Sequence, residues 1–113
     1  MKDFPAFMKN PKNHIKEHEQ NTPDVEGYVF QGADGGQMAF WTCLQDRKSK
    51  KHTHPFDEYF VCVSGKYIAY IEGKEYVLQQ GDELFIPKGA EQWGECIAGT
   101  RTIHAFGGQR VKG

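Results

Sequence analysis

Short apolar segments, each the length of a strand, follow one another from Tyr28 onward and are separated by turns that mostly contain glycine. They are rich in Val, Ile, Tyr and Phe, which favour a pleated, half-buried backbone. The segments are residues 28–30, 37–44, 58–63, 66–71, 75–78, 83–86, 92–97 and 100–106. No window of ten or more residues repeats apolar positions with the period of an amphipathic helix. This pattern predicts an all-β sandwich or barrel.

The 113-residue length allows a single domain with one core. The N-terminal segment is polar and is interrupted by Pro5, Pro11 and Pro23, so we expect an irregular arm there rather than a strand or a long helix. The predicted division is an N-terminal arm at 1–27, a barrel at 28–108 and a C-terminal tail at 109–113.

Two predicted strands, "YFVCV" (59–63) and "YIAYI" (67–71), are apolar at nearly every position. A strand with one face in water should alternate between apolar and polar residues. Something must therefore cover their outer face, either the N-terminal arm or a second subunit. We favour a homodimer on this ground.

Charge and hydropathy exclude several kinds of partner. The formal net charge is −1, which gives no reason to expect nucleic acid or an anionic membrane surface as a partner. No apolar run approaches the length of a membrane span, and the N-terminus lacks the apolar core of a secretory signal. Cys43, Cys62 and Cys96 form no CxxC pair. We expect a cytoplasmic protein with free, buried thiols.

The stretch "HTHPFDE" (52–58) has the residue types of a metal site. Alternate residues of an extended chain point the same way, so His52 and His54 share a face and Glu58 has the same parity. Two imidazoles and one carboxylate form a three-ligand set that leaves positions open for water or substrate. His-x-His differs from the helical His-x-x-x-His of metalloproteases. The alternative is a pair of surface histidines with Glu58 as their ion-pair partner.

The segments "HTHPFDEYFVCVSG" (52–65) and "GDELFIPKGAEQ" (81–92) resemble the two conserved motifs of the cupin superfamily, in the same order. The resemblance covers residues 46–95. It implies a small, single-domain, jelly-roll β-barrel. It also implies a divalent metal held by the two histidines and the glutamate of the first motif and by a histidine of the second. This sequence has Gln92 at the position of that last histidine, and Cys96 where the second motif usually ends in asparagine.

Three interpretations of Gln92 remain open. Its amide oxygen, a weaker ligand than imidazole, could complete a metal site with His52, His54 and Glu58. It could instead hydrogen-bond a metal-bound water or a substrate, leaving a two-histidine, one-carboxylate triad. In the third interpretation the metal is lost and the pocket only binds a ligand.

Strand parity selects further candidates. If Arg101 faces solvent, His104 on the last strand points inward and becomes a candidate proton shuttle or substitute ligand. The alternative is a hydrogen-bonded core histidine. Parity also places Phe60 and Cys96 inside the barrel, where, with Gln92, we expect them to contact substrate.

For function we carry two hypotheses. In the first, the protein is an enzyme that uses one divalent metal ion, Fe, Zn, Ni or Mn, on a small carboxylate, dicarbonyl or sugar derivative, by dioxygenase or isomerase chemistry. In the second, it is a non-catalytic ligand-binding or sensor cupin. The basic run "RKSKK" (47–51) could draw an anionic substrate to the barrel mouth, or could simply be a solvated hairpin loop.

Overall fold

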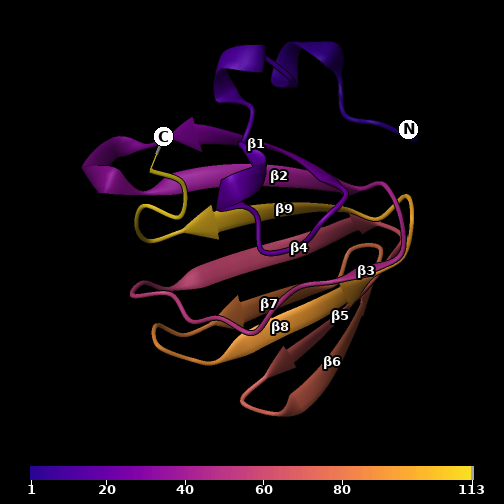
Figure 1. Cartoon of the computed structure of the whole chain (residues 1–113), viewed down its shortest axis with the longest axis vertical. Coiled ribbons are helices and arrows are strands. Elements are labelled where there is room, and N and C mark those ends of the chain that lie inside the picture. Colours follow the sequence, from indigo (N-terminus) through magenta and orange to yellow (C-terminus); the bar gives the residue numbers. More distant parts are fainter. Residues whose placement is uncertain (113) are drawn as a thin grey trace.

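The computed structural model describes residues 1–112, which form two packed antiparallel sheets (Figure 1). One sheet has five strands in the order β1-β2-β9-β4-β7, and the other has four in the order β3-β8-β5-β6. This arrangement confirms the predicted all-β jelly-roll barrel. The strands are β1 Val25–Gln31, β2 Gln37–Cys43, β3 Arg47–Lys48, β4 Glu58–Ser64, β5 Lys66–Ile71, β6 Lys74–Gln79, β7 Glu83–Ile86, β8 Gln92–Cys96 and β9 Arg101–Phe106.

The inward face of β4 contributes to both the apolar core and the polar site. Glu58, Phe60 and Cys62 point inward and are buried, whereas Tyr59 is exposed on the outer face. Phe60 and Cys62 lie in a core cluster between the sheets, together with Ala69, Ile71, Leu78, Ile86 and Ala90. Burying each large side chain of this kind stabilises the fold by about 1.5–3 kcal/mol. The same strand therefore carries both core residues and Glu58, which lies at its start.

The N-terminal arm contains three short 3-10 turns, η1 Ala6–Met8, η2 Pro11–Asn13 and η3 Glu17–Glu19, and a fourth, η4 Ala33–Gly35, joins β1 to β2. The arm lies against the β1 side of the five-stranded sheet (Figure 1). The ring of Phe4 packs on Phe40 with centroids 4.6 Å apart. Ile15 is buried, and its N–H donates to the carbonyl of Gly27 at 2.8 Å. The arm is thus held by apolar burial and by hydrogen bonds, which include this contact at the edge of β1.

The structure corrects the expectation of three free thiols. Cys43, at the end of β2, is disulfide-bonded to Cys96, at the end of β8, so the bond joins the two sheets. Only Cys62, among residues 1–112, is a free cysteine, and it is buried. The two bonded residues are 53 positions apart, and barrel closure brings their Cα atoms to 6.5 Å. Sequence spacing alone does not reveal such a pairing.

No helix among the described residues is long and apolar enough to cross a membrane.

Candidate functional site

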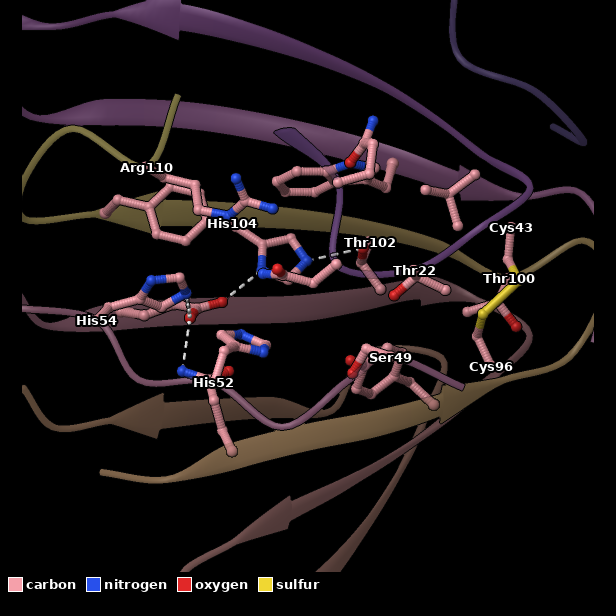
Figure 2. Close-up of a pocket in the computed structure, with 18 residues that line it drawn as sticks. Thr22, Cys43, Ser49, His52, His54, Cys96, Thr100, Thr102, His104 and Arg110 are labelled. Atoms are coloured by element: carbon pink, nitrogen blue, oxygen red, sulfur yellow. Dashed lines mark hydrogen bonds and ion pairs between the residues drawn. A yellow bond between two sulfur atoms is a disulfide. The ribbon is translucent and has the colours of Figure 1, made fainter. Parts of the chain in front are cut away.

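A pocket of about 90 Å³, open to solvent, lies between the two sheets (Figure 2). The disulfide lies at one end of it, and His52 and His54 lie at the other. Two glycines leave room for aromatic rings in its wall. A Cβ atom at Gly27 would collide with the indole of Trp41, and one at Gly94 would collide with the hydroxyl of Tyr67. Both rings line the pocket.

His52 and His54 lie on the segment between β3 and β4. Backbone hydrogen bonds of 2.9 Å in both directions tie His52 to Gln92, so the first histidine is fixed against β8. The rings of His52 and His54 lie with their centroids 4.8 Å apart. The ring of Phe56 stacks on the ring of His54, with centroids 4.9 Å apart. The two imidazoles therefore reach the same part of the pocket.

Glu58 is buried at the centre of the site. Its Oε1 accepts a hydrogen bond from Gln92 Nε2 at 3.2 Å, and its Oε2 lies 2.8 Å from His104 Nδ1. His54 Nε2 lies 3.7 Å from Oε1. Burial alone would raise the pKa of Glu58, but the hydrogen bond from His104, the neighbouring histidines and Gln92 together lower it below its usual value. Glu58 is therefore held as a carboxylate.

His104 lines the pocket with both ring nitrogens engaged. Nδ1 donates to the Glu58 carboxylate, and Nε2 lies 2.8 Å from the Thr102 hydroxyl. In the neutral ring Nε2 accepts the hydroxyl proton. His104 could act as a substitute metal ligand only by giving up one of these bonds. Its bond through Nδ1 orients the Glu58 carboxylate.

The donor chemistry of the site fits a divalent metal. His52 Nδ1 lies 2.8 Å from the Lys50 carbonyl and must donate to it, so its Nε2 lone pair remains available. Gln92 uses Nε2 to bind Glu58, so its Oε1 remains available as an acceptor. No buried side-chain N or O atom in residues 1–112 lacks a partner, so these free atoms are open to the pocket. No group of three or more His, Cys, Asp or Glu side chains within that range is already arranged around one metal position.

Arg110, in the C-terminal tail, lines the pocket, although no sequence pattern selected it. Its guanidinium points into the pocket near His104 (Figure 2). Nη1 donates to the Glu19 carbonyl at 2.6 Å, and the group lies 5.8 Å from the centre of the Trp41 ring. Burial lowers the pKa of Arg110, and the charge of Glu58 partly opposes this. Within residues 1–112 it forms no ion pair with a carboxylate.

The tail reaches the pocket because Val111 is buried against the five-stranded sheet. Its N–H donates to Gln37 Oε1 at 3.0 Å, and its carbonyl accepts from Gln37 Nε2 at 2.7 Å. The arm reaches the same place, because Gln20 accepts a 2.9 Å hydrogen bond from the Trp41 indole. Gln20, Asn21 and Thr22 also line the pocket. The N-terminal arm and the C-terminal tail thus both contribute residues to the pocket, whereas the strand pattern predicted lining residues only within the barrel.

Other predicted site residues are placed differently. Phe60 does not line the pocket but stacks beneath His104, with ring centroids 4.6 Å apart, because it belongs to the core cluster. Cys96 does line the pocket, yet its sulfur is in the disulfide and offers no thiol. Arg101 does not face solvent: it is buried on the outer face, its guanidinium 4.9 Å from the centre of the Phe4 ring.

The basic run at 47–51 is also only partly available to an anion. Arg47 is bonded to Asp24 at 2.7 Å, and Lys48 lies 3.5 Å from Glu95. Ser49 is the only member of the run that lines the pocket among the described residues. The cation at the pocket is therefore Arg110 rather than this loop.

The metal-free protein is expected to lose stability on acidification because of His54. Burial, opposed by Glu58, lowers the pKa of His54 to about 4. The unfolded chain, with an ordinary histidine pKa of about 6.5, binds more protons between these values, so stability falls as the pH drops through that window. Allowing for solvent screening, we expect a loss of about 1–2 kcal/mol from pH 7 to pH 4.5. Urea unfolding of wild type and of His54→Gln at the two pH values measures this loss of unfolding free energy. If both proteins lose the same amount, His54 is not its cause.

Comparisons with known proteins agree with this architecture. The family described as "Cupin domain" matches residues 40–101. An RmlC-like cupin from Shewanella frigidimarina is 17% identical with a TM-score of 0.72, covering 94% of this chain and 93% of that one. KdgF from Halomonas sp. is 16% identical with a TM-score of 0.68, covering 81% and 89%. A chain from the DMSP lyases RdDddP and RnDddQII is 15% identical with a TM-score of 0.65, covering 79% and 50%.

At these identities the solved structures share the fold with this chain, and the fold alone does not fix the reaction. No curated protein matches the chain.

Proposed function

The chain belongs to the cupin domain family, and from that premise we propose that it is an enzyme that binds one divalent metal ion and acts on a small carboxylate. The observation that carries this proposal is the pocket itself. It has imidazoles and a carboxylate on one wall and the guanidinium of Arg110 facing them.

His52, His54 and Glu58 would hold the ion, and Gln92 would either add its Oε1 as a weak ligand or bind the substrate through it. Two neutral imidazoles and one carboxylate suit Fe, Zn, Ni or Mn. A bound ion of this kind supplies Lewis-acid or oxygen-activating chemistry. Dioxygenase and isomerase reactions both remain compatible with this ligand set.

The chain's own residues would bind the substrate and control its protons. Arg110 would take the substrate carboxylate in a charge-assisted pair. Glu58 is kept ionised by His104 and Gln92, and His104 is backed by the Thr102 hydroxyl 2.8 Å away. A proton released by the substrate could therefore be held at His104, within the hydrogen-bonded series of Glu58, His104 and Thr102. Trp41 and residues 20–22 would limit the access of water.

The metal is tested by elemental analysis of protein purified without a metal-affinity tag. We expect near-stoichiometric metal in wild type and a loss of at least tenfold in a His52→Ala/His54→Ala variant, because two of the three strong ligands are gone. A His14→Ala/His18→Ala variant is the matched control, since both of its histidines are exposed on the arm. Equal trace metal in wild type and in the pocket variant would contradict the proposal.

A non-catalytic, ligand-binding cupin is the second candidate. It is favoured by the hydrogen bonds that Gln92 and His104 make to the two Glu58 carboxylate oxygens, since a metal would compete with them. Oxygen uptake and product analysis with the metal-loaded protein and a panel of small carboxylates separate the two. Binding of a carboxylate with no turnover and no oxygen uptake would support the second candidate.

A further inference from the structure

A tyrosine hydroxyl that the proposed function leaves unused lies between the two ends of the pocket. Tyr67 lines the pocket from β5, and its ring packs edge-on against Phe60 with centroids 5.3 Å apart. Gly94 makes room for it, because a Cβ atom at that position would collide with the hydroxyl. The Tyr67 hydroxyl therefore lies directly against the backbone of β8.

The place of this hydroxyl along the pocket follows from β8. The buried residues of that strand are Gln92, Gly94 and Cys96, which alternate with partly exposed ones. Residues two apart on one face of a strand are separated by about 7 Å. The Tyr67 hydroxyl, above Gly94, is thus about one such step from Gln92, at the histidine end of the pocket, and one step from Cys96, at the disulfide end.

Ser49 holds this hydroxyl so that the phenol proton stays free. Figure 2 shows Ser49 between the histidine end and the disulfide end of the pocket. Its Oγ accepts a 2.8 Å hydrogen bond from Gly94 N–H, and it is also hydrogen-bonded to Tyr67. Burial and the charge of Glu58 raise the pKa of Tyr67, whereas the bond with Ser49 lowers it. A bond that lowers the pKa of a phenol is one in which the phenol oxygen accepts. Tyr67 is therefore a neutral donor whose own proton is available to a ligand.

Gln92 supplies a complementary acceptor on the same strand. Its Nε2 donates to the Glu58 carboxylate at 3.2 Å, and because a carboxylate only accepts, the amide is fixed in that orientation. Its Oε1 is left for the pocket. One oxygen atom of a ligand, with a hydrogen bond of about 2.8 Å on each side, spans most of the step between the two groups.

We propose that Tyr67 and Gln92 bind a hydroxyl group of the substrate, which is a short hydroxycarboxylate. This inference rests on the carboxylate site of the proposed function, in which Arg110 takes the carboxylate. Only a hydroxyl accepts from the phenol and donates to the amide oxygen at the same time. A keto oxygen leaves Gln92 Oε1 without a donor, and a methylene group leaves both groups without a partner.

The size of the pocket limits the length of this substrate. A water-sized group takes up about 10–15 Å³ of such a cavity, so a pocket of about 90 Å³ admits roughly six to nine non-hydrogen atoms. Hydroxycarboxylates with the carbon chain of lactate or malate are within this limit. A hexose-derived acid exceeds it.

Calorimetric titration of the protein, with the metal that it carries, tests the hydroxyl site. The probes are the two enantiomers of malate and succinate, which lacks only the hydroxyl. One enantiomer is expected to bind wild type at least tenfold more tightly than succinate, because it makes two additional hydrogen bonds. In Tyr67→Phe, which removes the phenol hydroxyl and keeps the ring, this ratio is expected to fall below threefold. The affinity for succinate is expected to change less than twofold.

Tyr76→Phe is the matched control, because it also removes one hydroxyl from a partly buried ring but lies on β6 and does not line the pocket. It is expected to keep the full preference for malate. A preference that survives in Tyr67→Phe would place the substrate hydroxyl on the metal instead and overturn this inference. Equal binding of malate and succinate by wild type would overturn it while leaving the proposed function intact. If wild type binds neither acid, the carboxylate site of the proposed function fails as well.

Discussion

Replacing both Cys43 and Cys96 by serine is expected to lower the free energy of unfolding of the oxidised protein by about 3–4 kcal/mol. The bond closes a loop between residues 53 positions apart and joins the two sheets at one end of the pocket. Loss of the bond raises the conformational entropy of the unfolded chain. In the folded protein, that end of the pocket is then held only by packing and hydrogen bonds. Urea unfolding with and without dithiothreitol measures the effect.

Wild type should lose this stability when reduced, whereas the Cys43→Ser/Cys96→Ser variant should not respond to the reductant. Cys62→Ala is the control: it removes the free thiol, so the variant should remain as sensitive to reductant as wild type. A wild-type protein equally stable in both conditions would show that the bond does not contribute as expected.

Replacing Arg110 by glutamine is expected to weaken the binding of small carboxylates about 10- to 100-fold, which corresponds to 1.5–3 kcal/mol. The guanidinium is partly withdrawn from water and is not ion-paired within residues 1–112, so a carboxylate in the pocket gains a charge-assisted bond at little extra desolvation cost. Calorimetric titration with malonate, and with its dimethyl ester as the neutral probe, measures the difference.

Lys50→Gln is the matched control for Arg110→Gln, because it removes one positive charge from the exposed loop beside the pocket without touching its lining. Its affinity for malonate should fall less than twofold. Arg110→Gln should lose the preference for malonate over the ester. If Arg110→Gln binds malonate as tightly as wild type, Arg110 does not bind the carboxylate.

Strand parity and motif spacing select five residues that the structure brings to one pocket. They are His52, His54, Glu58, Gln92 and His104. Alternation along β4 and β9 turns Glu58 and His104 inward. The expectation used for His104, a solvent-facing Arg101, was wrong, because Arg101 lies on the outer face but is buried. The all-β barrel was predicted from a pattern that is equally local, short apolar segments separated by turns. These features depend on neighbours along the chain or on adjacent strands.

Arg110 and the disulfide depend instead on how the barrel closes. No local pattern near Arg110 predicts that Val111 is buried against Gln37, which lies 74 positions earlier in the chain. Phe60 was misplaced for a related reason: parity gives the direction of a side chain but not its depth. His104 lies between Phe60 and the pocket, so an inward residue became core rather than lining.

Alternation along β9 makes two surfaces depend on one register. Thr102, His104 and Phe106 face the pocket side, while Ile103 and Ala105 lie on the outer face of the same sheet. An insertion or deletion of a single residue within this strand would exchange the two sets, placing His104 on the outer face and Ile103 in the pocket. Length changes in relatives should therefore be confined to the turns at either end of β9, and its length is a useful anchor for aligning distant sequences.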